Sequence, residues 1–181
     1  MTPFVVTTLV PTDVETVCTI DQCKQFLRIR NNYEDAVLTT LRAAAGDVIE
    51  RSIGRPLGTA QARVFYRGQP CGELDVPLPL QEVTGVAYQD VEDGGWWAVD
   101  LADVKVDLLG HGVYGTISMV SWPRAQGLRV DFTCGYAATP PGLRQAVIAL
   151  VAWWFETRET SGGLPEHILA ALAPFRTGQV W

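Results

Sequence analysis

The stretch PPGLRQAVIALVAWWFETRE, residues 140–159, decides the fold class of this chain. A proline at the first turn of a helix is favoured, because its missing backbone N–H would have no partner there in any case. One face of the predicted helix is apolar and consists of Leu143, Ala146, Val147, Leu150 and Trp154. Further apolar side chains widen this surface almost all round, and such a helix must be covered on more than one side. The stretch therefore predicts a buried helix in a bundle.

Two further helices are predicted near the N-terminus. Thr19 and Gln22 have the spacing of a capping box, which starts a short helix over residues 19–30. A longer helix over residues 33–53 has one apolar stripe and a charged opposite face. Within it, residues 43–46 are small, so we expect another helix to cross closely there. These helices and the helix at the C-terminal end supply the expected helical body.

Residues 60–134 change to short β-prone runs that are broken by glycine and proline, which predicts an inserted antiparallel sheet or small sandwich. The expected class is α+β, a helical bundle of N-terminal helices and a long C-terminal helix with an inserted antiparallel β-sheet module. An N-terminal arm rich in Thr and Val either pairs with a sheet edge, docks on a neighbour or is frayed. The expected parts are an extended arm at 1–18, a helical body at 19–57 plus 140–173, a β module at 58–139 and a docking tail at 174–181.

Composition excludes several classes of function. The chain has 181 residues and a formal net charge of −6, and it lacks the basic stripe of a protein that binds DNA tightly. Its four cysteines form no CxxC pair and lie far from both histidines, so buried thiols of a reduced protein are expected rather than a zinc site. No apolar run reaches the roughly 18 residues of a membrane span. The first twenty residues lack the basic start of a signal peptide.

Catalytic motifs are missing from the sequence. It contains no GxSxG elbow, no GxxxxGK[ST] loop and no GxGxxG loop. Glu166 and His167 are adjacent and would point in different directions on a helix, so a first-turn glutamate favoured by the helix dipole is the better explanation. Glu156 and Glu159 could hold a cation, but a hard cation needs about six oxygen ligands. The two carboxylates are therefore better explained as a solvated helix end. We expect no enzyme activity, no cofactor and no metal.

Exposed aromatic residues are the candidate interaction sites. Trp96 and Trp97 follow two glycines in a predicted hairpin, and one of them must point away from the core because strand neighbours face opposite sides. That tryptophan is either an interface anchor or part of simple edge packing. Trp181 ends a polar tail with no obvious core to join, and insertion into a pocket on another subunit would explain it.

Five stretches, read in order, carry a resemblance to a known family. They are residues 20–28 (IDQCKQFLR), 43–57 (AAAGDVIERSIGRPL), 78–86 (LPLQEVTGV), 128–136 with 140–159, and 169–176 (LAALAPFR). Together they resemble the head–tail connector, or head-completion adaptor, family of long-tailed bacteriophages and gene transfer agents. The chain departs from the family at Phe175, where the family usually has tyrosine. The N-terminal arm and the Trp181 tail lie outside the resemblance.

The resemblance implies a ring, typically of twelve subunits, beneath the portal of the particle. The C-terminal segment of such a subunit docks on the portal protein, and the other face of the ring receives a stopper or tail-completion protein. No catalytic residues come with the family. The residues assigned here to the docking tail are Phe175, Arg176, Val180 and Trp181.

The expected function is therefore structural, with DNA passing through the ring without specific binding and no contact with a membrane. The acidic charge fits this role, because like charge keeps phosphates from sticking. The expected location is the head–tail interface of the virion, after assembly in the host cytoplasm. A tail-completion or stopper protein of the same particle is an alternative, but such proteins tend to be all-β or to have one small helix. The second alternative is an unrecognised small ligand-binding domain. A deep pocket with a perturbed titratable group would favour this alternative.

Overall fold

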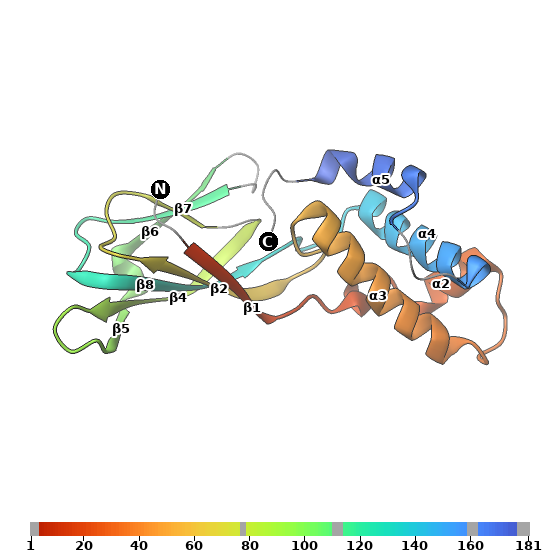
Figure 1. Cartoon of the computed structure of the whole chain (residues 1–181), viewed down its shortest axis with the longest axis horizontal. Coiled ribbons are helices and arrows are strands. Elements are labelled where there is room, and N and C mark those ends of the chain that lie inside the picture. The colour runs from red at the N-terminus through yellow and green to blue at the C-terminus, as the bar shows by residue number, and fades with distance from the viewer. Residues whose placement is uncertain (1–3, 77–78, 110–113, 159–162, 177–181) are drawn as a thin grey trace. The chain divides into compact units, whose positions relative to one another are not determined.

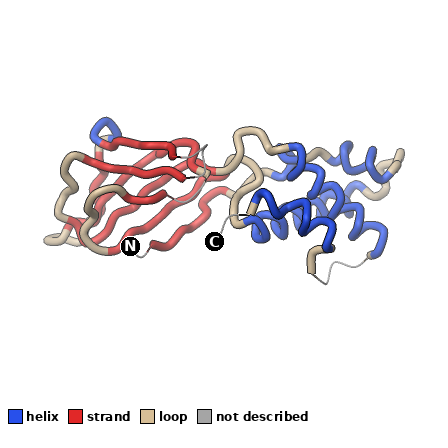
Figure 2. Tube along the Cα trace, turned by 90° about the horizontal axis from the view of Figure 1, so that it is seen from above, coloured by secondary structure: helices blue, strands red, loops and turns tan. Residues whose placement is uncertain are grey.

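The computed structural model describes residues 4–76, 79–109, 114–158 and 163–176 (Figure 1). Within these ranges the chain forms two compact units. The helical unit comprises residues 12–58 together with the chain from residue 136, and the β unit comprises residues 59–135 together with the chain up to residue 11. Figure 2 shows that the two units differ in secondary structure: helices, in blue, make up one unit, and strands, in red, make up most of the other. The α+β class with an inserted β module is confirmed.

Within the described residues, the helical unit consists of α1 (Val14–Val17), α2 (Ile20–Leu27), α3 (Asp35–Ile53), α4 (Pro141–Thr157), α5 (Glu166–Leu172) and the 3-10 turn η2 (Ala173–Phe175). The capping box predicted at the start of α2 is present. The Gln22 backbone N donates to Thr19 Oγ1 at 3.3 Å, and the Thr19 backbone N donates to Gln22 Oε1 at 3.0 Å. The helix ends at Leu27, earlier than predicted, because Arg28 adopts the left-handed conformation with φ 58°.

Helix α3 begins at Asp35 rather than Tyr33, whose side chain is 90% exposed. It ends at Ile53, and Gly54 follows as the cap, with a left-handed φ of 69° that glycine adopts without strain. The close crossing predicted at residues 43–46 is made by α1. A Cβ added to Gly46 would lie 2.9 Å from Val14 Cγ2, so only a glycine lets the two helices approach this far.

Helix α4 is the buried helix that its sequence predicts. It packs against α2, α3 and α5, which cover it from several sides (Figure 1). The buried residues are Leu143, Ala146, Val147, Ile148, Leu150, Val151 and Ala152. The cover is incomplete, because Trp153 remains 43% exposed; its ring and the His167 ring form an edge-to-face pair with 6.3 Å between centroids.

The described strands of the β unit form two antiparallel sheets. One has the order β1-β2-β8-β4-β5 and the other has the order β3-β7-β6. The bounds are β1 (Phe4–Val10), β2 (Ala60–Arg67), β3 (Leu74–Val76), β4 (Leu80–Asp90), β5 (Trp96–Val99), β6 (Val104–Leu109), β7 (Tyr114–Met119) and β8 (Ala125–Cys134), with a 3-10 turn η1 at Leu101–Asp103.

The N-terminal arm expected over residues 1–18 is divided between the two units. Strand β1 pairs antiparallel with β2, from Phe4 opposite Tyr66 to Thr8 opposite Ala62 (Figure 1). The arm therefore adds a strand to a sheet edge, which is one of the three possibilities that its composition allows. Residues 14–17 form helix α1 instead, and the Asp13 side chain accepts the Glu15 N–H at 2.9 Å to cap it.

Each unit buries its own hydrophobic core. The core of the helical unit draws on α1 to α5, and that of the β unit lies between the facing sides of its two sheets. The two sheets approach so closely at Gly115 that an added Cβ would meet Leu80, at 3.1 Å from its Cβ. In the described part of the chain, no helix combines the length and apolarity that crossing a membrane requires.

Candidate interaction surfaces

The predicted docking tail begins on the helical unit. Phe175 ends η2 and packs, half-buried, against the helical core, with its ring 3.3 Å from where a Cβ on Gly142 would lie. Arg176 is exposed, and its Nη2 donates to Ser52 Oγ at 3.2 Å. These contacts hold both residues beside α3 and the start of α4. Val180 and Trp181 lie outside the described residues.

Trp96 and Trp97 are both exposed, at 41% and 54%. They occupy β5, an edge strand that pairs only with β4 among the described strands, so both side chains reach solvent although they face opposite sides of the sheet. Trp97 lies opposite Tyr88, on the side of the core, and Trp96 lies opposite Gln89, on the other side. The prediction that one of the pair points away from the core is confirmed for Trp96.

The side of the large sheet that faces away from the core carries a cluster that we call the outer face, consisting of Arg63, Phe65, Trp96, Arg129 and Asp131. The strand register brings these residues together. Arg63 on β2 lies opposite Asp131 on β8, and Phe65 lies opposite Arg129. Along β2 and β8 these positions alternate with buried apolar residues such as Val64 and Val130, as a sheet with one buried side requires.

Charged and aromatic contacts link the outer face into one network. Arg63 binds Asp131 with two parallel hydrogen bonds, 2.5 Å from Nε to Oδ1 and 3.0 Å from Nη2 to Oδ2. This bond to Asp131 raises the pKa of the Arg63 guanidinium. The Arg129 guanidinium carbon lies 5.4 Å from the centroid of the Trp96 ring, a cation–π contact. The Trp96 ring meets Phe65 edge to face at 6.1 Å.

Arg129 is the member of this network whose bonding is incomplete. Its Nε is shielded from solvent and has no hydrogen-bond acceptor within the described residues. Its contact with Asp131 is long, 4.0 Å from Nε to Oδ2, because that carboxylate already binds Arg63. Beside it, a hollow of about 370 Å³ is lined in part by Phe65, Trp96 and Gln89. The outer face thus offers an aromatic hollow next to an arginine whose ion pair with Asp131 is long.

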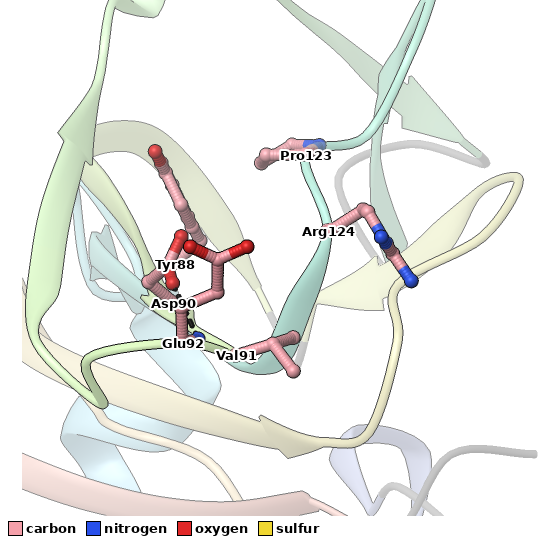
Figure 3. Close-up of a pocket in the computed structure, with 6 residues that line it drawn as sticks. All are labelled: Tyr88, Asp90, Val91, Glu92, Pro123 and Arg124. Atoms are coloured by element: carbon pink, nitrogen blue, oxygen red, sulfur yellow. Dashed lines mark hydrogen bonds between the residues drawn. The ribbon is translucent and has the colours of Figure 1, made fainter.

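A second hollow, of about 430 Å³, lies at the turn between β4 and β5 (Figure 3). Its lining residues are Tyr88, Asp90, Val91, Glu92, Pro123 and Arg124. Asp90 Oδ1 accepts the backbone N–H of Glu92 at 2.6 Å, so this carboxylate shapes the turn. Figure 3 shows that the Arg124 side chain points away from the two carboxylates. The hollow therefore has acidic groups at its surface, and its lining residues include no nucleophile paired with a base.

Two buried cations of the helical unit, Arg42 and Lys24, form ion pairs. Arg42 forms an ion pair with Glu15 and donates from Nη1 to the Cys18 carbonyl at 3.0 Å, so it joins α3 to the segment before α2. Lys24 Nζ lies 2.9 Å from Asp35 Oδ1 and 2.6 Å from Asn32 Oδ1. These contacts neutralise charges that would be costly to bury alone.

The cysteines follow the expectation of buried thiols at three of four positions. Cys18, Cys23 and Cys134 are buried, whereas Cys71 is exposed. A hydrogen bond between Cys18 and Cys23, together with burial, raises the pKa of the Cys18 thiol. In the described ranges, no group of three His, Cys, Asp or Glu side chains is placed to hold a metal ion.

Sequence reasoning found Trp96 but missed its partners Phe65 and Arg129. The alternation in residues 62–66 and 128–132 already indicates one polar side for each strand. It does not indicate that β2 and β8, which are about 60 residues apart in the sequence, are neighbours. The two C-terminal predictions within the described residues, Phe175 and Arg176, lie on the helical unit and not on this surface.

Solved structures share this fold. One chain from a structure described as the neck of an empty gene transfer agent (GTA) particle is 23% identical, with a TM-score of 0.74 over 98% of this chain and 97% of that one. Chains from a native GTA virion and from a native GTA neck computed with C12 symmetry are 22% and 21% identical, with TM-scores of 0.72 and 0.68; each match covers 97% of both chains.

The sequence also matches a family model. No curated protein gives a match to this chain. The model described as "Head completion protein" matches residues 16–177, which is most of the sequence and includes residues of both units. The chain therefore belongs to the head completion protein family.

Proposed function

We propose that this protein is a subunit of a ring that lies beneath the portal and joins the head of a phage-like particle to its tail. The observation that carries the proposal is the family match over residues 16–177. Head completion proteins are structural components and not enzymes. DNA passes through the ring without specific binding, and the formal net charge of −6 favours passage because like charge repels phosphates.

The similar structures support a place in the neck. They are described as parts of gene transfer agent particles, with one neck computed with C6 symmetry and another computed with C12 symmetry. We assign this chain a corresponding place at the head–tail interface of a virion, in a ring of twelve copies assembled in the host cytoplasm. A stopper or tail-completion protein then binds the face of the ring opposite the portal.

The C-terminal residues are proposed to contact the portal protein. Phe175 packs against the helical core and serves as the fixed base of the docking tail. Arg176 is exposed and has a neutral partner, Ser52, so its charge is free to pair with an acidic portal group. Val180 and Trp181 follow in the sequence and supply apolar groups for a crevice on the portal.

The test is to mix the purified protein with portal rings of its own particle and to image the mixture by electron microscopy. We expect an added ring on one end of the portal. A chain truncated after Arg176 keeps the packed Phe175 and should lose this ring, and Arg176→Ala should weaken it. Arg51→Ala is the matched control, because Arg51 is also an exposed arginine of the helical unit, with a side chain 79% exposed.

Three results would contradict parts of this proposal. If the truncated chain binds as well as the full chain, the docking tail is not the anchor. Binding that requires a preformed connector on the portal would indicate a stopper or tail-completion protein instead. Bare portals in every sample would exclude the portal as the partner and favour a ligand-binding domain.

A further inference from the structure

An exposed acidic turn on the β unit complements the outer face. Residues 90–103 contain five carboxylates and no lysine or arginine. Three of them, Asp90, Asp93 and Asp100, accept hydrogen bonds from nearby backbone N–H groups and thereby shape their turns. Glu92 is exposed, and within the described residues no ion pair involves it. Its neighbour Val91 is an exposed apolar residue, at 53%.

The chemistry of this turn matches the outer face group by group. The outer face has an aromatic hollow beside Trp96 and, next to it, Arg129, whose Nε has no hydrogen-bond acceptor among the described residues and lies 4.0 Å from Asp131 Oδ2. The turn has an apolar side chain, Val91, next to a carboxylate, Glu92. A carboxylate that reaches a partly buried guanidinium makes charge-assisted hydrogen bonds, which are about twice as strong as neutral ones.

Among the described residues of one chain, no ion pair joins Glu92 to Arg129. Arg129 lies opposite Ala87 on β4, and β4 continues for three more residues to Asp90 before the turn begins. At about 3.3 Å per residue, Asp90 is already about 10 Å from Ala87 along the strand, and Glu92 lies beyond it. The turn and the outer face do not satisfy each other within one subunit, so a contact between the turn of one copy and the outer face of another would join two subunits.

We propose that the outer face of one subunit receives the β4–β5 turn of a second copy, with Glu92 binding Arg129 and Val91 entering the hollow beside Trp96. A head-to-tail contact of this kind generates a closed ring when its rotation closes. The inference rests on the proposed function, since it names the subunit contact of the proposed ring. It assigns each exposed tryptophan of β5 a different role: Trp96 lies in the subunit contact and Trp97 does not.

The first test measures ring assembly by variants of the two surfaces, with sedimentation and electron microscopy as readouts. Glu92→Lys and Trp96→Ala should each weaken assembly by about tenfold or more, as loss of an interface anchor does. Glu73→Lys makes the same charge change at an exposed position outside the turn, and Trp97→Ala removes the neighbouring tryptophan. Both controls should assemble like the unaltered protein.

The second test detects the contact directly. Isotope-labelled protein carrying Arg129→Lys and Glu92→Gln is mixed with the unlabelled, unaltered protein and treated with a carbodiimide, which couples amines to adjacent carboxylates. The amine at position 129 and the carboxylate at position 92 are then on different chains by design. Mass spectrometry should find a peptide that joins position 129 to Glu92, and a mixture in which both chains carry Glu92→Gln should lack it.

The outcomes separate this inference from the proposed function. Rings that form equally well from Glu92→Lys and Trp96→Ala protein, without the crosslink, overturn the contact and leave the connector role intact. If the unaltered protein forms no ring on portals, the connector role fails, and the crosslink at high protein concentration still decides the contact. If Arg129→Gln protein forms intact rings that bind DNA more weakly, the proposed subunit contact is overturned, and the outer face is a nucleic-acid surface instead.

Discussion

Glu50 is a carboxyl group whose protonation depends on folding. It lies near the C-terminal end of α3, and its Oε1 accepts the Leu57 N–H at 2.8 Å. Burial raises the pKa of this carboxyl above its ordinary value of 4.5, and the hydrogen bond from Leu57 offsets only part of that rise. The folded state therefore holds the proton more tightly than the unfolded state. Ionisation of Glu50 then makes the free energy of unfolding fall as the pH rises from about 4.5 through the raised pKa.

The first prediction is that Glu50→Gln raises the free energy of unfolding by more at neutral pH than at acidic pH. Glutamine keeps an oxygen that accepts the Leu57 N–H but carries no charge to bury. We expect the stability gain over the unaltered protein to be larger at pH 7 than at pH 4, in urea denaturation followed by circular dichroism. Glu73→Gln, at an exposed position, is the control and should show no such trend. A gain that is equal at both pH values would contradict the prediction.

Elements of the helical unit approach one another through small residues. Residues 43–46 predict a close crossing from sequence, and α1 makes it at Gly46, beside Val14. The identity of the crossing helix was not predictable, because a segment of four residues has no detectable helical period. Its start is instead decided by the Asp13 cap, and its position by packing on α3.

The second prediction concerns this crossing. Gly46→Ala gains helix propensity worth about 1 kcal/mol, but its Cβ would lie 2.9 Å from Val14 Cγ2. Overpacking costs about 1–3 kcal/mol, so we expect a net loss of up to about 2 kcal/mol in the free energy of unfolding. Combining Gly46→Ala with Val14→Ala should cost less than the sum of the two single changes. Simple additivity in urea denaturation would show that α1 does not press on Gly46.

At the scale of the whole molecule, the two units have separate cores. Among the residues whose burial is described, the core of the helical unit is formed by the segments before Gly58 and after Gly135, and the core of the β unit by residues 60–134. The two chain segments that leave the helical unit are tied together, since Thr139 Oγ1 donates to the Leu57 carbonyl at 2.9 Å. The helical unit therefore has a closed core without the β unit.

The third prediction is that the helical unit folds when residues 59–135 are replaced by a flexible linker of about six Gly and Ser residues. We expect a helical circular dichroism spectrum and a cooperative thermal transition. Leu150→Ala in this shortened chain is the control, because loss of a fully buried leucine costs about 2–5 kcal/mol and should lower the transition temperature. A shortened chain that melts without cooperativity would show that the β unit is needed for folding.

The sequence alone determined the class of the fold and several of its local features. The α+β order, the capping box at Thr19 and the buried helix α4 follow from periodicity and cap chemistry, which are local properties. The outward direction of one tryptophan follows from strand alternation, which is also local. The family resemblance likewise came from stretches of sequence read in order, and the match over residues 16–177 confirms it.

Only the tertiary structure decided which distant segments are neighbours. The outer face exists because β2 pairs with β8, so that Arg63 meets Asp131 across 68 positions of sequence. No local pattern specifies that pairing, since any alternating strand can bury its apolar side against another. The placement of Phe175 against the helical core has the same origin, because burial depends on what the fold brings to a residue and not on the residue alone.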